Sequence, residues 1–260
     1  MKELQFANLK IENRVAYITI NRPEKRNALN ATVVQNLKDL FKFAEDSSDV
    51  KIIVLKAKGE SFCAGADLAY LKELQSNSFD ENLADSNHLK ELFEQIYLNK
   101  KVVIAQVEGH AIAGGGGLAT VCDFVFSVPE AKFGFTEVKI GFVPAIISVF
   151  ILRKIGEKKT KELLLTGDLI TANKAKAMEL INYIVDSEHI EDEVQAFCEK
   201  LINNCSADSL ALTKELLANV SSMNYNDGLT YASKMNATAR STKDCVSGIS
   251  SFLNKEKIKW

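Results

Sequence analysis

Short runs of β-branched residues alternate with amphipathic stretches along the chain, and this alternation constrains the fold more than any other feature. Residues 51–56 (KIIVLK) and 101–107 (KVVIAQV) have the composition of strands. Before the first of these runs, apolar residues recur at helical spacing over 31–47, after the capping sequence Asn30-Ala31-Thr32. Strands that alternate with helices predict an α/β protein.

The remaining pattern suggests a body and a helical tail. Residues 9–20 alternate apolar and polar positions around a turn at 12–14, which predicts a hairpin. From residue 187 onward only helical periodicity remains. We therefore predict a strand-and-helix core over 1–186 and a helical region over 187–260.

One polar segment interrupts the helical pattern in the first half of the chain. Helices are expected at about 68–75 and 86–99, and residues 76–85 between them are rich in Ser, Asn and Asp. We interpret this segment as a mobile loop that would suit a lid.

Composition excludes several classes of protein. The 260 residues are 47% hydrophobic and 25% charged, which is typical of globular chains, and the net charge of −2 lacks the basic excess of nucleic-acid binders. The longest apolar run, 142–152, is too short to span a bilayer. The N-terminal residues lack the apolar segment of a signal peptide, so we expect the mature protein to begin at residue 1. The five cysteines form no CxxC pair and only three histidines are present. We expect a cytoplasmic protein without a metal site.

Small residues crowd the junction that follows the strand at 51–56. The sequence Phe62-Cys-Ala-Gly-Ala-Asp-Leu68 leaves backbone amides uncovered at Ala64, Gly65 and Ala66, and Asp67 can cap a helix that starts at Leu68. These amides could bind an anionic oxygen. The alternative is a capped helix start that uses small residues for packing.

Four consecutive glycines, Gly114 to Gly117, precede a helix expected at 118–122. Each costs about 0.5–1 kcal/mol relative to Ala in regular structure, so the fold must need bare backbone here. We interpret the run as a wall against a ligand; tight helix packing is the alternative.

A single carboxylate, Glu137, lies in the apolar stretch Phe133 to Pro144. Burial would raise its pKa towards the working pH and make it a proton carrier. The alternative is a surface glutamate paired with Lys139.

With these three stretches and three others, the chain resembles the enoyl-CoA hydratase/isomerase (crotonase) family over essentially its whole length. The motifs, in order, are NRPEKRNALN at 21–30, FCAGADL at 62–68, GHAIAGGGGLATVCD at 109–123, FGFTEVKIGFVP at 133–144, LLLTGDLITANKAKAMELIN at 163–182 and SGISSFLNKEKIKW at the end. The resemblance implies a crotonase-like spiral of ββα units with a C-terminal helical trimerisation region. It further implies a homotrimer or dimer of trimers that binds acyl-CoA.

The resemblance also implies roles for individual residues. The amides of Ala66 and Gly114 would form an oxyanion hole for the thioester oxygen, and Glu137 would be the acid/base. Coenzyme A, a part of the substrate and not a separate cofactor, would contact a set of matching positions: Lys25, Arg26, Ala28, Leu29, Ala64, Asp67 and Leu68. Lys255 and Lys257 match a C-terminal basic pair that can reach the coenzyme A of a neighbouring subunit.

The sequence departs from the family at one catalytic position. Two-carboxylate hydratases have a glutamate where this chain has Gly117. The closest resemblance is to bacterial 3-methylglutaconyl-CoA hydratases of leucine degradation, which implies hydration of a short, branched or acidic 2-enoyl-CoA, with Gly117 leaving space in the pocket. Two alternatives remain open, a Δ3,Δ2-enoyl-CoA isomerase with Glu137 as a single proton shuttle and a non-catalytic member that binds acyl-CoA or RNA.

Overall fold

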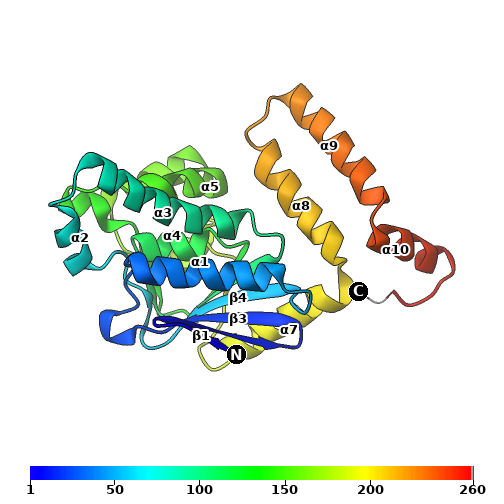
Figure 1. Cartoon of the computed structure of the whole chain (residues 1–260), viewed down its shortest axis with the longest axis horizontal. Coiled ribbons are helices and arrows are strands. Elements are labelled where there is room, and N and C mark those ends of the chain that lie inside the picture. Colours follow the sequence, from blue (N-terminus) through cyan, green and yellow to red (C-terminus); the bar gives the residue numbers. More distant parts are fainter. Residues whose placement is uncertain (259) are drawn as a thin grey trace.

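A computed structural model describes residues 1–258 and 260 and confirms the α/β architecture (Figure 1). The larger sheet has the strand order β1-β2-β3-β4-β6-β8-β11. The first three strands are antiparallel and the others parallel. Their bounds are β1 Lys2–Glu3, β2 Ala7–Glu12, β3 Val15–Ile20, β4 Ile52–Ala57, β6 Val102–Val107, β8 Phe124–Ser127 and β11 Tyr183–Ile184. The hairpin predicted over 9–20 is β2 and β3.

The smaller sheet has the order β10-β9-β7-β5. Its strands are β5 Ser61–Cys63, β7 His110–Ile112, β9 Lys132–Gly134 and β10 Ile170–Thr171. β5, β7 and β9 run parallel to one another. Each directly follows a strand of the larger sheet, so successive ββα units contribute one strand to each sheet.

Helices follow the strand pairs. They are α1 Ala31–Asp46, α2 Leu68–Leu74, α3 Phe79–Tyr97, α4 Gly114–Thr120, α5 Ala145–Thr166, α6 Ala172–Ala177, α7 Ile190–Asn204, α8 Ala207–Val220, α9 Tyr225–Arg240 and α10 Lys243–Leu253, with short 3-10 helices η1 Pro23–Lys25 and η2 Thr136–Ile140. α1 packs against α3 and covers β2 and β3. The amphipathic pattern of α1 buries Val33, Leu37 and Phe41 completely.

The prediction of a mobile loop over 76–85 is wrong, because α3 begins inside that segment. The Ser78 hydroxyl accepts a hydrogen bond from the Glu81 amide, and the Glu81 carboxylate accepts one from the Ser78 amide. This capping box satisfies two amides that would otherwise lack partners. The polar residues at the junction therefore start a helix, and only three residues separate α2 from Ser78.

After β11 the chain continues through α7 to α10. α7 packs against β6 and β8 and buries Val194 and Cys198 in the main core. By contrast, α8 and α9 form a pair of helices that extends away from the body, and α10 follows the end of α9 and contacts both (Figure 1). α7 thus packs as part of the core, although the predicted boundary after residue 186 places it in the C-terminal helical region.

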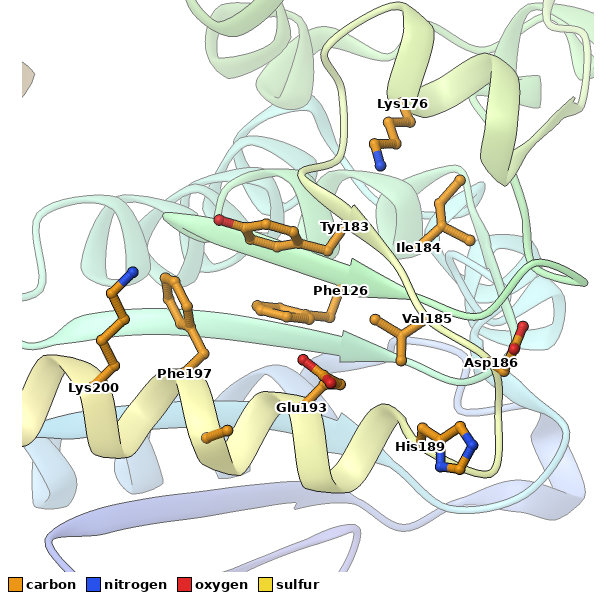
Figure 2. A pocket seen from close by; sticks show the side chains of 11 residues that line it. Phe126, Lys176, Tyr183, Ile184, Val185, Asp186, His189, Glu193, Phe197 and Lys200 are labelled. Atoms are coloured by element: carbon orange, nitrogen blue, oxygen red, sulfur yellow. The ribbon is translucent and has the colours of Figure 1, made fainter.

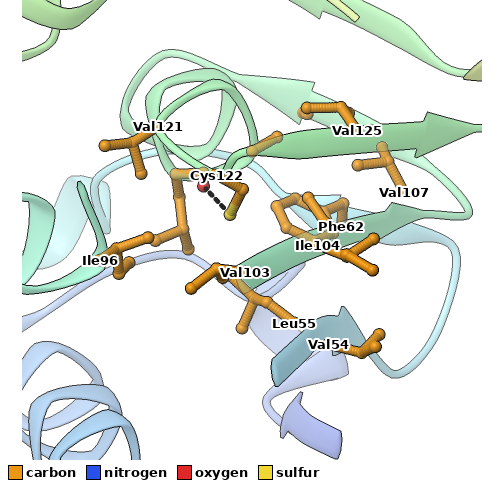
Figure 3. Close-up of a cluster of buried hydrophobic side chains, with 14 of the residues drawn as sticks. Val54, Leu55, Phe62, Ile96, Val103, Ile104, Val107, Val121, Cys122 and Val125 are labelled. Atoms are coloured by element: carbon orange, nitrogen blue, oxygen red, sulfur yellow. Dashed lines mark hydrogen bonds between the residues drawn. The ribbon is translucent and has the colours of Figure 1, made fainter. Parts of the chain in front are cut away.

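The main core lies between the larger sheet and the helices that cover it. Figure 3 shows one part of it, where Val103 and Ile104 of β6 lie near Val121 and Cys122, just after α4. The Cys122 thiol donates a hydrogen bond to the carbonyl oxygen of Leu118 at 3.4 Å. In the described part of the chain, no helix has the length and apolar character that crossing a bilayer requires.

Candidate active site

Three predicted site residues follow the ends of three neighbouring parallel strands. Ala66 comes after β5, Gly114 after β7 and Glu137 after β9. β7 lies between the other two strands, with Ala111 in register with both Cys63 and Phe133. Because the carboxyl ends of parallel strands meet at one edge of a sheet, the three residues reach the same edge.

The backbone amide of Ala66 faces away from the segment beside it. Leu29 and Ala66 form a parallel bridge, in which the Leu29 amide donates to the carbonyl of Gly65 at 2.7 Å and the Asp67 amide donates to the carbonyl of Leu29 at 2.8 Å. The backbone groups of the residue between the two bonded ones point to the opposite side. Ala66 is exposed, so its amide is available to a ligand.

The turn that carries Ala66 lies against the start of α4. A Cβ on Gly65 would come 2.8 Å from the Ala113 Cβ and 3.5 Å from the Gly114 nitrogen, and Gly65 has a φ of +92°. Glycine is the residue that tolerates both this close approach and this conformation. Neither the Ala66 amide nor the Gly114 amide donates to a backbone acceptor in residues 1–258 and 260. Two free amides thus lie on adjoining segments.

Glu137 is a buried carboxylate on η2. It is 9% exposed, and its Oε2 has no hydrogen-bond partner among the described residues. Burial raises the pKa of this carboxyl, opposed by a hydrogen bond from its own backbone amide. Lys139 pairs instead with Asp168 at 3.1 Å. The surface ion pair that the sequence left open is therefore not formed.

A buried ion pair ties the loop after β3 to the loop after β5. Arg22 Nη2 lies 2.8 Å from Asp67 Oδ2, and both side chains are 10% exposed. Arg22 also donates to the carbonyl of Ala28 at 3.0 Å, and Asp67 accepts from the Ala69 amide at 2.9 Å as the α2 cap. Desolvation raises the pKa of Asp67, but the Arg22 and Ala69 hydrogen bonds outweigh it and hold the pKa below its usual value. The Asp67 carboxylate is thus occupied by protein groups.

Asn27 completes this connection between the two loops. Its side-chain amide donates to the carbonyls of Lys58 and Ser61 at 2.8 and 2.7 Å, and its Oδ1 accepts from the Arg22 amide at 2.8 Å. Asn27 is fully buried. A buried polar side chain with these partners holds the loop rigid. Sequence reasoning gave no role to Arg22, although it lies inside the first family motif, as Asn27 does.

The predicted coenzyme A contacts on these loops differ in exposure. Lys25 and Arg26 are exposed, whereas Ala28 and Leu29 are buried at 7% and 4%. Ala64 donates its amide to the carbonyl of Arg26 at 3.0 Å, which joins the two loops again. Leu68, the residue after Asp67, is 74% exposed.

The expectation of pocket space beside Gly117 is wrong. A Cβ on Gly117 would lie 2.2 Å from Cγ2 of Ile147 and 3.0 Å from Cε1 of Phe93. Both side chains are buried. The glycines do not merely precede the predicted helix, because α4 begins at Gly114 and includes all four. Bare backbone at 117 therefore serves the packing of α5 and α3 on α4.

The chain as a whole has counterparts among known proteins. The sequence profile described as Enoyl-CoA hydratase/isomerase matches residues 10–260. The chain belongs to this family. A protein of Thermus thermophilus named "Putative enoyl-CoA hydratase" is 41% identical over 94% of this chain and 96% of its own length. The "Short-chain-enoyl-CoA hydratase" of Clostridium acetobutylicum is 30% identical over 98% of this chain and 97% of that protein.

Solved structures agree with the sequence comparison. A crystal structure of an enoyl-CoA hydratase from Shewanella pealeana has a TM-score of 0.93 at 28% identity, and the match covers 99% of this chain and 97% of that one. The predicted crotonase-type fold and the expectation of an enzyme of the enoyl-CoA hydratase/isomerase family are confirmed.

The C-terminal lysines of this family member lie far from its own candidate site. Arg14 Nη1 donates to the carbonyl oxygen of Trp260 at 2.8 Å, and Arg14 immediately precedes β3. The loop with Lys25 follows the other end of that strand. Lys255 and Lys257, close to Trp260 in the chain, are therefore at the opposite end of the sheet.

One hollow in the enoyl-CoA hydratase/isomerase chain is separate from the candidate site. It has a volume of about 690 Å³ and lies between β8, β11, α6 and α7 (Figure 2). Phe126 and Tyr183 stack at 4.4 Å between ring centroids on its wall, and Lys176 and Lys200 extend beside them. None of the predicted site residues lines it.

Proposed function

We propose that this family member adds water across the double bond of a short 2-enoyl-CoA. The observation that carries the proposal is Glu137, a buried carboxylate with an unpartnered oxygen at the sheet edge that also carries the free amides of Ala66 and Gly114. The name of the Clostridium acetobutylicum relative supports a short acyl chain.

The two amides would hold the thioester oxygen of the substrate. When a nucleophile attacks C3 of a conjugated enoyl thioester, negative charge develops on that oxygen as an enolate. Two preorganised N–H donors stabilise this charge more than the neutral carbonyl, and removing one such donor typically costs about 10²–10³ in rate. The contacts of Arg22, Asn27 and Asp67 keep the turn with Ala66 in place.

Glu137 would carry out both proton transfers of the reaction. As a carboxylate it accepts a proton from water while the water oxygen bonds to C3. The resulting carboxylic acid then gives that proton to C2 as the enolate collapses, so the elements of water are added and Glu137 returns to its starting state. A raised pKa suits a group that must act as base and acid in turn.

Within the short enoyl-CoA class we propose a branched or acidic acyl group of the 3-methylglutaconyl type, which would place the reaction in leucine degradation. The support is the likeness of residues 136–148 to that subgroup, together with the absence of a carboxylate at position 117. The coenzyme A part would lie along the exposed loop residues Lys25 and Arg26 and the segment from Ala64 to Leu68.

Isomerisation is the second candidate, and the packing around position 117 favours it. Ile147 and Phe93 occupy the place of a second carboxylate, so Glu137 is the one acid of the proposed reaction. An isomerase needs one group that takes a proton from C2 of a 3-enoyl-CoA and returns it to C4. Glu137 would carry out both transfers while the amides of Ala66 and Gly114 hold the thioester oxygen.

A single assay distinguishes the candidates. The purified protein is offered crotonyl-CoA, 3-methylglutaconyl-CoA and a 3-enoyl-CoA, and the absorbance of the conjugated thioester is followed. Hydration removes this absorbance from the first two substrates, whereas isomerisation generates it from the third. Loss of absorbance with crotonyl-CoA but not with the branched acid would reject the proposed subgroup. No change with any of the three would reject the proposed function.

A further inference from the structure

The helix that carries the Gly114 amide is intrinsically weak. α4 has 7 residues, and 4 of them are glycine. Isolated helices of this length are unstable in water, and glycine lowers their stability further. The position of the Gly114 amide therefore depends on the contacts that other elements make with α4.

One lysine binds the free carbonyl groups at the end of α4. Lys154 of α5 donates from Nζ to the carbonyl of Thr120 at 2.6 Å and to the carbonyl of Cys122 at 3.0 Å. The last carbonyls of a helix have no partner within it, so an ammonium group there satisfies them and adds a favourable charge. Ile147 lies two helical turns earlier in α5 and packs on Gly117.

This contact carries a cost that an apolar side chain would avoid. Burial lowers the pKa of Lys154, and Asp123 is a nearby carboxylate that opposes this shift. Asp123 itself is bound by Lys214 at 2.5 Å and by the Val103 amide at 2.7 Å. Asp123 thus has its own partners. Lys154 is the side chain that binds the Thr120 carbonyl at the end of α4 itself.

We infer that Lys154 is a positioning residue for the reaction, one that sets the place of the Gly114 amide by holding the end of α4. The inference rests on the proposed function, because it takes the Gly114 amide as a donor to the thioester oxygen. Lys154 contacts α4 at the end remote from Gly114 and acts through the helix, not on the substrate.

The test compares two lysines that bind carbonyls at helix ends, the half-buried Lys154 and the buried Lys51. Lys51 donates to the carbonyls of Ile202 and Cys205 at the end of α7, at 2.8 and 2.5 Å, and is 2% exposed. Lys154→Met and Lys51→Met each remove a lysine that binds carbonyls at a helix end, but only Lys154 contacts α4. Thermal unfolding, oligomeric state, kcat and KM are measured for both, with Lys154→Arg as the conservative variant.

A spectroscopic probe reports the amides directly. 4-Dimethylaminocinnamoyl-CoA absorbs at longer wavelength when hydrogen bonds polarise its thioester carbonyl. We expect Lys154→Met to bind this probe with a smaller red shift than the wild type and to lower kcat about tenfold, less than the loss of an oxyanion donor. KM should change little. Lys154→Arg should recover most of both, and Lys51→Met should lose stability alone.

Several results would overturn the inference. An unchanged red shift and a kcat within twofold in Lys154→Met would make the lysine purely structural. The same conclusion would follow if Lys51→Met lost as much kcat. If Lys154→Met does not fold, Lys154→Gln, which keeps a donor without the charge, decides between the same outcomes. A wild-type protein without activity on enoyl-CoA substrates would instead reject the proposed function.

Discussion

Ile147 occupies the space that a side chain at position 117 would need, with its Cγ2 2.2 Å from the site of a Cβ on Gly117. Ile147 is 4% exposed, so the contact is part of the core and not of an open pocket. α5 thus approaches α4 closely because α4 has no side chain there. The chain lacks a carboxylate at 117 and has packed an apolar residue in its place.

We expect Gly117→Glu to lower both stability and activity. Forcing a side chain into this contact should cost about 1–3 kcal/mol of the free energy of unfolding, as other overpacked cores do. A second carboxylate near Glu137 would also raise one pKa of the pair and repel an anionic substrate. Steady-state rates on crotonyl-CoA and 3-methylglutaconyl-CoA, with thermal unfolding, measure both effects.

The double variant Gly117→Glu/Ile147→Ala separates these two causes. Removal of Ile147 makes room, so the two substitutions should be coupled by about 0.5–3 kcal/mol in a double-mutant cycle. Ile147→Ala alone should cost about 2–5 kcal/mol. Additive effects on stability would show that the two residues do not compete for the same space.

Glu137→Gln should abolish most of the activity and retain binding of the substrate. Loss of a general acid/base typically lowers turnover by about 10²–10⁴. Glu130→Gln, an exposed glutamate between β8 and β9, serves as the control. Binding of coenzyme A is measured by calorimetry, and near-native turnover of Glu137→Gln would remove this residue from the mechanism.

The pH profile should reveal the raised pKa of Glu137. Hydration needs the carboxylate as a base, so kcat/KM should fall as the pH drops through a pKa above the ordinary value of 4.5. The same limb should be absent from the residual activity of Glu137→Gln. An acidic limb at or below the ordinary glutamate value would contradict the burial of this carboxyl in the free enzyme.

The Arg22–Asp67 pair should stabilise the protein above acid pH. The pKa of Asp67 is lowered in the folded state, so its contribution is present above the unfolded pKa and is lost as the pH falls through the folded pKa. Asp67→Asn leaves Arg22 buried without its partner charge, and we expect a loss of about 3–5 kcal/mol at neutral pH. Denaturant unfolding at several pH values measures this, and a variant as stable as the wild type at pH 7 would contradict it.

We expect the protein to form a trimer or a dimer of trimers. Large apolar side chains are exposed on α8 to α10, among them Leu217, Leu229, Val246, Ile249 and Phe252. Exposed apolar patches of this kind mark contact surfaces. Sedimentation at micromolar concentration tests the prediction, and a monomer would also leave Lys255 and Lys257 without a neighbouring site to reach.

Much of the fold could be predicted from the sequence because the relevant signals are local. Buried parallel strands such as β4 and β6 appear as continuous apolar runs, and amphipathic helices such as α1 appear at helical spacing. The apolar neighbours of Glu137 predicted a buried carboxylate for the same reason. The start of α3 inside residues 76–85 is also encoded locally, because Ser78 and Glu81 have the spacing of a capping box.

The sequence by itself determined the order of the ββα units and the residue types at the three strand ends. Only the tertiary structure decided which groups those residues meet: Asp67 with Arg22, Lys139 with Asp168 rather than Glu137, and Lys154 with the end of α4. It also decided that the space beside Gly117 is filled by Ile147. These contacts join residues about thirty or more positions apart, or elements whose approach depends on how the two sheets pack. The hydrophobic periodicity of one segment does not encode which distant residue it contacts, because that contact is set by the packing of the whole core.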